Sequence, residues 1–217
     1  MGFFITFEGI EGCGKTTQLR LAAERLTADG YEVAVTREPG GCPIADEVRA
    51  ILLDARNTAM VPLAELLLYA AARAQHVSEV ITPALAAGKI VLCDRFTDST
   101  LAYQGYGRGL DKELIARLNA LAAGTVTPDL TILLDCPVEI GLARAMARIN
   151  GSTAAREERF EQESRLFHER IRDGFLSLAA VEPRRFVVID GSQGVDETGI
   201  ALMDALQSRL PGAPGGS

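Results

Sequence analysis

The chain has 217 residues, 47% of them hydrophobic, and its 22 basic and 29 acidic residues give a net charge of −7. This length suits one α/β domain with a sizeable core, and the acidic balance argues against nucleic acid or an anionic membrane as a main partner. No apolar run reaches the roughly 18 residues of a membrane span, and no basic signal-peptide segment opens the chain. The four cysteines are scattered without metal-ligand spacing, so we expect a reduced, cytoplasmic protein. His76 and His168 stand alone in the sequence and read as ordinary helix residues.

Short apolar segments alternate with helical patterns along the chain. Strands are expected at residues 3–7, 31–36, 90–93, 130–134 and 186–189. Helices are expected at 16–28, 44–54, 62–87 with a kink near Pro83, 98–104, 112–123, 138–148, 157–178 and 195–210. This alternation predicts an α/β fold with a five-stranded parallel sheet, helices on both faces, and the ligand at the carboxyl ends of the strands. We expect one domain over residues 1–210, followed by a flexible tail at 211–217.

The first strand runs directly into a phosphate-binding motif. Residues 9–16 read GIEGCGKT and match G-x-x-x-x-G-K-[ST], with a predicted strand before them and a helix after them. The glycines let successive backbone N–H groups point at phosphate oxygens, and the helix N-terminus adds the positive end of its dipole. Lys15 would reach the β and γ phosphates, and the Thr16 hydroxyl would bind Mg²⁺. The motif predicts the three-layer P-loop NTPase fold and an ATP site formed by Gly9, Ile10, Glu11, Gly12, Cys13, Gly14, Lys15, Thr16 and Thr17.

Charged residues follow the second and third predicted strands. Asp94 and Arg95 end the third strand, where an aspartate can hold Mg²⁺ through water and an arginine can grip a second phosphate group. A strand-end salt bridge is the alternative for this pair. Arg37 and Arg49, after the second strand and on the helix behind it, could face the same cleft or lie on the surface.

Two further clusters are suited to contact a nucleoside. Tyr69 and Arg73 lie four residues apart on one helix face, where a ring could stack on a base and a guanidinium could bond its edge. A core tyrosine beside a surface arginine is the alternative. Within the glycine-rich segment 99–109, the amide of Gln104 can read a base edge, and the glycines indicate a loop that folds closely over a ligand.

Several of these segments, taken together, resemble the bacterial thymidylate (dTMP) kinases along essentially the whole chain. They are FEGIEGCGKTT at 7–17, TREPGG at 36–41, DRFTDS at 94–99, AYQ at 102–104 and FEQES at 160–164. The resemblance implies transfer of the γ-phosphoryl group of ATP to dTMP, giving dTDP and ADP, with Mg²⁺ as cofactor. It also implies the homodimer that is typical of the family.

The resemblance further implies roles for single residues. Glu11 would approach the sugar 3′-hydroxyl, and Tyr103 would crowd the 2′ position, which selects deoxyribose. Tyr69 would stack on thymine, while Arg73 and Gln104 would bond its edge. The other implied contacts are those of Arg37, Arg49, Arg95 and Ser99 with dTMP, and those of Ser192 and Gln193 with adenine. Members of this family often have a cis peptide at the position of Glu38-Pro39, which nothing in this sequence establishes.

Gly12 separates two arrangements within that family. Some members carry an arginine at this position of the phosphate loop, whereas others have glycine and supply catalytic arginines from a mobile lid. An arginine finger can be worth ~10³–10⁵ in rate, and a closing lid also excludes water. The expected lid, at about 149–158, is somewhat longer than the family leads us to expect. Four arginines bracket the polar gap at 150–155: Arg144, Arg148, Arg156 and Arg159. The catalytic candidates among them, in order, are Arg148, Arg156 and Arg159.

Two other functions remain open. The first is a kinase for another nucleoside monophosphate or a nucleoside; a single methyl group is worth only ~1–3 kcal/mol, so some use of dUMP is expected in any case. The second is a P-loop ATPase or switch that hydrolyses ATP without an acceptor. The lack of an N-K-x-D segment counts against a GTPase switch, and the expected acceptor-site arginines count against a simple ATPase.

Overall fold

The computed structural model describes residues 2–150, 159–160, 163–210 and 212. The expected lid arginine Arg156, residues 151–158 of the expected lid, and all of the expected tail except residue 212 lie outside the described residues.

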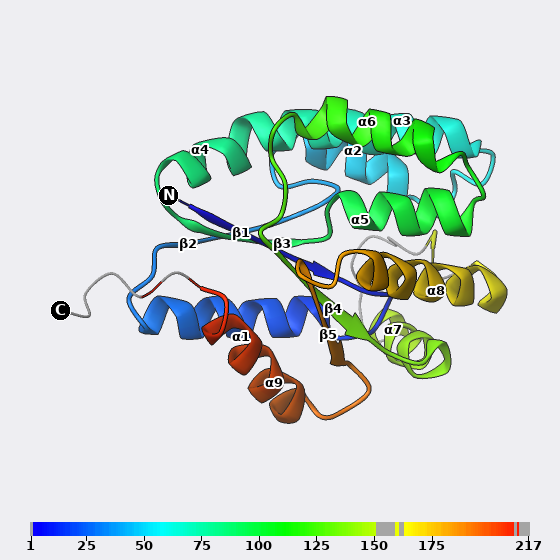
Figure 1. Ribbon diagram of the computed structural model, residues 1–217. Coiled ribbons are helices and arrows are strands. Elements are labelled where there is room, and N and C mark those ends of the chain that lie inside the picture. The colour runs from blue at the N-terminus through cyan, green and yellow to red at the C-terminus, as the bar shows by residue number, and fades with distance from the viewer. Residues whose placement is uncertain (1, 151–158, 161–162, 211, 213–217) are drawn as a thin grey trace.

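The centre of the fold is a parallel sheet with the strand order β2-β3-β1-β4-β5, as Figure 1 shows. Its strands are β1 (Phe3–Glu8), β2 (Val33–Arg37), β3 (Ile90–Asp94), β4 (Leu130–Asp135) and β5 (Phe186–Asp190). The predicted five-stranded parallel sheet is thus confirmed, with strand ends shifted by one or two residues. Phe7 of β1 and Arg37 of β2 both pair with Asp94 of β3, so the charged strand ends expected from the sequence lie at one edge.

Helices cover both faces of this sheet. Their bounds are α1 (Lys15–Ala28), α2 (Pro43–Leu53), α3 (Pro62–His76), α4 (Thr82–Ala86), α5 (Thr97–Thr100), α6 (Lys112–Ala123), α7 (Val138–Asn150), α8 (Arg165–Val181) and α9 (Val195–Gln207). Two π-helical segments, η1 (Val77–Ile81) and η2 (Leu101–Gly107), continue α3 and α5. In Figure 1, α1 and α9 lie on one side of the sheet and α2 to α6 gather on the other. Helix α8 packs against η2.

Three helices differ from their predicted form. The helix expected over 62–87 contains the π-helical segment η1 just before Pro83, because a proline lacks an N–H and crowds the carbonyl four residues earlier. The helix expected at 98–104 divides into α5 and η2 and extends to Gly107. The prediction that a helix begins at 157 is wrong for the described residues: α8 begins at Arg165, where Ser164 caps it by accepting a hydrogen bond from the backbone N–H of Phe167.

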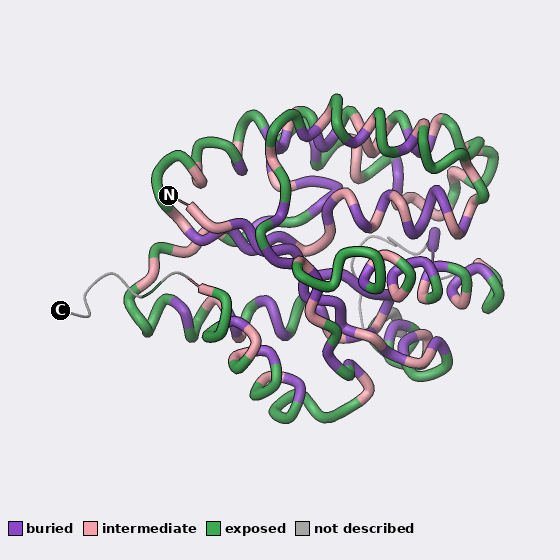
Figure 2. Tube along the Cα trace, in the orientation of Figure 1, coloured by how far each residue is buried: buried purple, intermediate pink, exposed green. Residues whose placement is uncertain are grey.

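The core lies along the sheet and the inner faces of the helices. Figure 2 shows the buried residues concentrated there, and β1 and β4 are almost entirely buried. The four cysteines are buried and free. In the part of the chain that the structure describes, none of the helices has the length and apolar character needed to cross a bilayer. Because β1 lies in the middle of the sheet, the loop that follows it is placed at the centre of the carboxyl edge.

Candidate active site

The loop between β1 and α1 has the backbone geometry of an anion cradle. Gly9, Gly12 and Gly14 have φ angles of 136°, 69° and 100°, which glycine adopts at little cost. Gly14 is also the N-cap of α1, so the free N–H groups of the first helical turn face the loop. Local sequence therefore builds the loop geometry that the motif predicts.

Two side chains of the motif take up positions suited to phosphate and metal binding. The ammonium of Lys15 donates hydrogen bonds to the carbonyl oxygens of Gly9 (3.0 Å) and Ile10 (2.8 Å), which holds it against the loop. The hydroxyl of Thr16 donates to Oδ2 of Asp94 at 2.8 Å. Mg²⁺ prefers oxygen ligands and keeps several waters and phosphate oxygens around it, so this donor pair fits the ion.

Helix α7 packs directly against the backbone of the loop. A Cβ atom added to Gly12 would lie 1.9 Å from the carbonyl oxygen of Gly141, and one added to Gly141 would lie 2.5 Å from that of Glu11. No side chain fits at Gly12 without moving α7. This contact leaves no room for an arginine within the loop, and α7 itself leads to Arg148 in its last turn.

Arg95 lies against the phosphate loop in a strained backbone conformation. Its φ of 71° is positive, which is uncommon for a residue with a side chain and is often found at functional sites. Its guanidinium donates to the carbonyl of Gly9 (3.0 Å), the hydroxyl of Ser99 (3.1 Å) and Oε1 of Glu11 (3.1 Å), and it lies 4.8 Å from the ring centre of Tyr103. Burial opposes its charge, but Tyr103 and the neighbouring carboxylates raise its pKa well above the usual value. The expected acceptor-phosphate residue thus lies beside the phosphate loop.

Glu11 is the point where the loop meets helices from later in the chain. Its Oε1 accepts hydrogen bonds from Arg95 and from the hydroxyl of Tyr103, and its Oε2 lies 3.2 Å from Nδ1 of His168 on α8. Burial opposes the negative charge, but the contact with His168 and the charges of Arg95 and Lys15 outweigh it and lower the pKa to about 2. Glu11 is therefore a carboxylate that is fixed from three sides.

The two histidines lie in helices, as expected, but they are not ordinary helix residues. Both are fully buried and contact carboxylates. Nδ1 of His76 lies 3.0 Å from Oε1 of Glu38, and its Nε2 lies 2.6 Å from the hydroxyl oxygen of Thr36. Neither contact could be read from the sequence, because each partner comes from a distant segment.

The expected nucleoside contacts gather on α3 and η2. Tyr103 packs edge-on against Phe160, Phe167 and Phe175, with ring centres 5.4–6.4 Å away. Burial and the charge of Glu65 raise the pKa of Tyr69, while Arg159, Arg95 and Arg49 act in the opposite direction. Tyr69, on α3, therefore lies within electrostatic reach of Glu65 and of these three arginines.

Arg73 is buried, so the surface alternative for this residue is wrong. Only 2% of it is exposed, and its guanidinium donates to Oε2 of Glu38 (2.8 Å), Oδ1 of Asn119 (2.7 Å) and the hydroxyl of Thr100 (3.0 Å). Three segments of the chain thus hold its position. On each of the two terminal nitrogens of the guanidinium, one N–H takes no part in these three hydrogen bonds.

Arg37 and Arg49 flank the turn after β2. Arg37 donates to Oδ1 of Asp46 at 3.2 Å, and Arg49 donates to the carbonyl of Pro39 at 2.9 Å. Both side chains lie next to Gly40, and the peptide between Glu38 and Pro39 is cis. The structure therefore brings both arginines to one turn at the carboxyl edge of the sheet.

The loop after β5 is held by its own side chains and by α7. Oδ1 of Asp190 accepts from the backbone N–H (2.8 Å) and the hydroxyl (2.6 Å) of Ser192, and Gln193 donates to Oδ2 at 3.2 Å. Arg144 donates to the carbonyls of Gly191 (2.7 Å) and Ser192 (2.8 Å). This arginine braces the loop that carries the expected adenine contacts.

The other expected lid arginines differ in their surroundings. Arg148 is exposed in the last turn of α7. Arg159 is buried; it donates to the carbonyl of Leu52, lies 2.7 Å from Oε2 of Glu65, and packs over the ring of Phe160. None of these contacts of Arg159 is with the phosphate loop.

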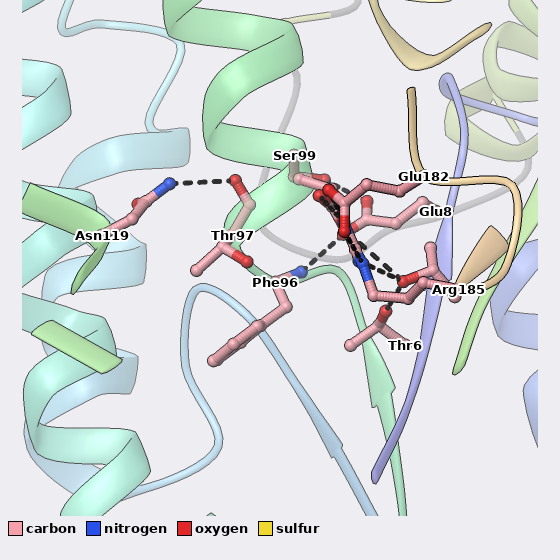
Figure 3. A network of polar contacts seen from close by, with 10 residues as sticks. Thr6, Glu8, Phe96, Thr97, Ser99, Asn119, Glu182 and Arg185 are labelled. Carbon is pink, nitrogen blue, oxygen red and sulfur yellow. Dashed lines mark hydrogen bonds and ion pairs between the residues drawn. The ribbon is translucent and has the colours of Figure 1, made fainter. Parts of the chain in front are cut away.

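Glu8, at the end of β1, was not predicted as a site residue. Figure 3 shows its carboxylate at the start of the segment that carries Arg95 and Ser99: it accepts from the backbone N–H of Phe96 (2.8 Å) and from the hydroxyl of Ser99 (2.5 Å). Burial and the nearby charge of Asp98 raise its pKa to about 7, against the opposing effect of Arg95. An acidic residue at the end of a mostly apolar strand was the signal that could have identified it.

Figure 3 also shows what surrounds this carboxylate. Arg185 and Thr6 are labelled there beside Glu8. Arg185 forms two hydrogen bonds with Asp98, at 2.6 and 2.9 Å, and another with the hydroxyl of Thr131 (2.7 Å), which pairs with that of Thr6 at 2.9 Å. Asp98 lies in α5, three residues after Arg95. The network therefore connects β1, β4 and the residue before β5 to the segment on which Arg95 stands.

Comparisons with known proteins agree with this arrangement. The family model for thymidylate kinase matches residues 7–199. The thymidylate kinase of Geobacter sulfurreducens is 72% identical over 97% of this chain and 99% of its own, and that of Geotalea uraniireducens is 68% identical over the same two shares. The crystal structure of thymidylate kinase from Ehrlichia chaffeensis matches with a TM-score of 0.76 at 38% identity, covering 95% of this chain and 98% of that one. This chain belongs to the thymidylate kinase family.

Proposed function

We propose that this chain transfers the γ-phosphoryl group of ATP to dTMP, giving dTDP and ADP for dTTP synthesis. The observation that carries the proposal is the position of Arg95, whose guanidinium bonds both the carbonyl of Gly9 in the phosphate loop and the carboxylate of Glu11. A cation at this place can hold an acceptor phosphate next to the γ-phosphate of ATP. Membership of the thymidylate kinase family supports the choice of acceptor.

ATP occupies the donor half of the site, which we define as residues 9–17 with Ser192 and Gln193. The loop N–H groups and Lys15 contact the phosphates, and the loop after β5 contacts adenine. Mg²⁺, when held by Thr16 and through water by Asp94, supplies positive charge at the β and γ phosphates.

dTMP occupies the acceptor half, built on α3, η2 and the segment after β3. Its phosphate is held by Arg95, with Arg37, Arg49 and Ser99 nearby, and its sugar lies between Glu11 and Tyr103. Tyr69 stacks on the base, and Arg73 and Gln104 contact the base edge. Buried partners hold most of these side chains in place, which lowers the entropy cost of aligning the acceptor.

The reaction itself requires alignment and charge more than proton transfer. An oxygen of the dTMP phosphate attacks the γ-phosphorus, the bond to the β–γ bridging oxygen breaks, and ADP leaves with its electron pair. Because the acceptor is already an anion, no strong general base is needed. Arg95 offsets the repulsion between the two anions, and Lys15 stabilises the charge that develops during transfer.

Arg148 and Arg156 are our candidates for lid arginines that reach the transferring group. Arg159 also belonged to the expected catalytic set, but its contacts with Leu52 and Glu65 support an anchoring role. Under this proposal, Arg148 reaches the phosphate loop from α7, the helix that packs against the loop at Gly12.

We also propose that the enzyme is a cytoplasmic homodimer. Apolar side chains on the neighbouring helices α2 and α3 support association, because Ile44, Ile51, Leu63 and Leu67 are each 48–55% exposed. Light scattering on the purified protein should give twice the chain mass of 23.2 kDa. A mass equal to one chain would contradict the dimer.

The test of the activity is ADP release from ATP–Mg²⁺ with different acceptors: none, dTMP, dUMP, the ribose form of TMP, dCMP and AMP. We expect strong dependence on dTMP, with some use of dUMP and poor use of the ribose form. Equal ADP release without an acceptor would overturn the kinase and favour an ATPase. Preference for another nucleotide would assign a different substrate.

A further inference from the structure

Glu65 is a buried carboxylate on α3 around which several segments meet. Only 1% of the residue is exposed. Its Oε1 accepts a hydrogen bond from Nε2 of Gln104 at 2.7 Å and one from Nε of Arg108 at 3.3 Å. Its Oε2 accepts from NH2 of Arg108 at 3.2 Å and lies 2.7 Å from NH2 of Arg159. No sequence motif assigns this carboxylate a role.

The two arginines keep Glu65 an acceptor of hydrogen bonds. A buried carboxylate is costly unless opposite charges accompany it, and here two guanidinium groups face it. Arg108 is held in turn by Glu163, through a hydrogen bond of 2.5 Å. An ionised carboxylate has no proton to donate, so any group that bonds Glu65 must be a donor.

This requirement decides which way the Gln104 amide faces. An amide side chain has a donor end and an acceptor end that can exchange places by a rotation. Only the NH₂ end can bond Glu65, so Oε1 of Gln104 is turned away from it. Gln104 is therefore held as an acceptor toward anything that binds beside it on η2.

An acceptor in this position distinguishes between pyrimidines. Thymine and uracil carry a hydrogen on N3 and can donate it to a carbonyl oxygen. Cytosine carries a lone pair on N3, which would face the oxygen of Gln104 and repel it. A site that bonds a substrate N–H rejects an analogue that lacks it, because its own polar group is then left unpaired.

We propose that Glu65 is a positioning residue that fixes the amide of Gln104 and thereby selects dTMP and dUMP over dCMP. The inference rests on the proposed function, because it assumes that the base of the acceptor lies beside Gln104. It goes beyond that function because it assigns the choice between pyrimidines to a carboxylate that need not contact the substrate.

The decisive variant is Glu65→Gln. Glutamine has nearly the same shape but can donate as well as accept, so the amide of Gln104 becomes free to reverse. We expect the ratio of kcat/KM for dTMP to that for dCMP to fall by about tenfold or more. KM for ATP should stay within about twofold of the wild-type value, since the donor half is not in contact with Glu65.

Arg108→Gln is the matched control. It removes one charged partner of Glu65 but leaves the hydrogen bond with Gln104 in place. Activity with both acceptors can fall together, but the ratio between them should stay within about twofold of wild type. If Glu65→Gln also lowers both activities by the same factor, the role of Glu65 is only structural and the proposal is overturned.

Gln104→Leu keeps the proposal testable if Glu65→Gln does not fold, as judged by circular dichroism. Loss of the amide should reduce the dTMP-to-dCMP ratio in the presence of the native Glu65. An unchanged ratio would mean that Gln104 does not read the base, which also overturns the proposal. Failure of the wild-type protein to use dTMP at all would instead contradict the proposed function, so the two failures are distinguishable.

Discussion

In the donor half, the groups suited to bind phosphate are the backbone N–H groups of consecutive residues. Glycines allow the loop conformation that orients these groups. In the acceptor half, the corresponding groups are side chains from α3, η2 and the segment after β3, and buried carboxylates hold them. Glu8 and Glu11 stand three residues apart at the boundary between the halves and have opposite environments. The pKa of Glu8 is raised to about 7, whereas that of Glu11 is lowered to about 2.

The two halves therefore differ in how they are organised to bind charged groups. The donor half depends on main-chain conformation, so it should be sensitive to steric change and largely insensitive to pH. The acceptor half depends on paired buried charges, so it should respond to the loss of single partners and to protonation. Substitutions of single residues in each half test this distinction.

Arg95→Ala should cause the largest loss, because Arg95 joins the two halves. We expect kcat with dTMP to fall by ~10³-fold or more, while binding of ATP stays near normal. Steady-state kinetics and titration with a fluorescent ATP analogue would measure the two effects. Arg20→Ala, in an exposed pair with Glu24 on α1, is the control and should leave both unchanged. A variant that kept most of its turnover would remove Arg95 from the acceptor site.

Gly12→Ala should break the donor half by steric means. The new Cβ would meet the carbonyl oxygen of Gly141 at 1.9 Å, and the φ of 69° adds strain, so we expect about 3 kcal/mol of lost unfolding free energy. Gly14→Ala is the matched control, because its φ is also positive but nothing lies within 4 Å of its added Cβ. Only strain, about 1 kcal/mol, should appear there. Equal losses in urea unfolding would mean that the contact with α7 is unimportant.

Glu8→Gln should change how stability depends on pH. Glu8 has a higher pKa in the folded protein, about 7, than its ordinary value of 4.5, so the folded state binds the proton more tightly. Its contribution to stability is fully present below pH 4.5 and is lost as the pH rises through 7. The shift corresponds to at most about 3 kcal/mol, and the glutamine variant should not show this loss.

Urea unfolding at pH 5 and pH 8 measures this effect. Between these values the unfolding free energy of the wild type should fall more than that of Glu8→Gln. Glu11 does not contribute to this difference. The pH range over which its protonation affects stability lies between its folded pKa of about 2 and its ordinary pKa of 4.5. Glu24→Gln, at an exposed carboxylate, should follow the wild type. Parallel curves for Glu8→Gln and wild type would contradict the raised pKa.

His168→Phe should have the smallest effect, confined to the acceptor. Loss of the contact with Oε2 of Glu11 weakens the hold on that carboxylate, and we expect KM for dTMP to rise by ~10-fold with KM for ATP unchanged. Preference for dTMP over its 3′-deoxy analogue should fall as well. Ser177→Ala, on the exposed part of the same helix, is the control. A rise in KM for ATP instead would place His168 in the donor half.

Much of the fold was predictable because its signals are local. Each strand is a short apolar run, and alternation with helices indicates a parallel sheet covered on both faces. The errors lie where neighbours or capping decide the local structure: the π-helical segments η1 and η2, and the start of α8 at Arg165 after the cap of Ser164. Periodicity of apolar residues carries little information about such features.

The candidate site likewise has residues that local sequence predicts and residues that it does not. The phosphate loop and the chemistry of Lys15 and Thr16 could be predicted from the sequence, because these groups follow one another along the chain and local backbone conformation places them. The roles that we assign to Glu8, Glu65 and His168 depend on tertiary contacts. Their partners lie in distant segments, and burial together with nearby charge sets the protonation and orientation of such groups.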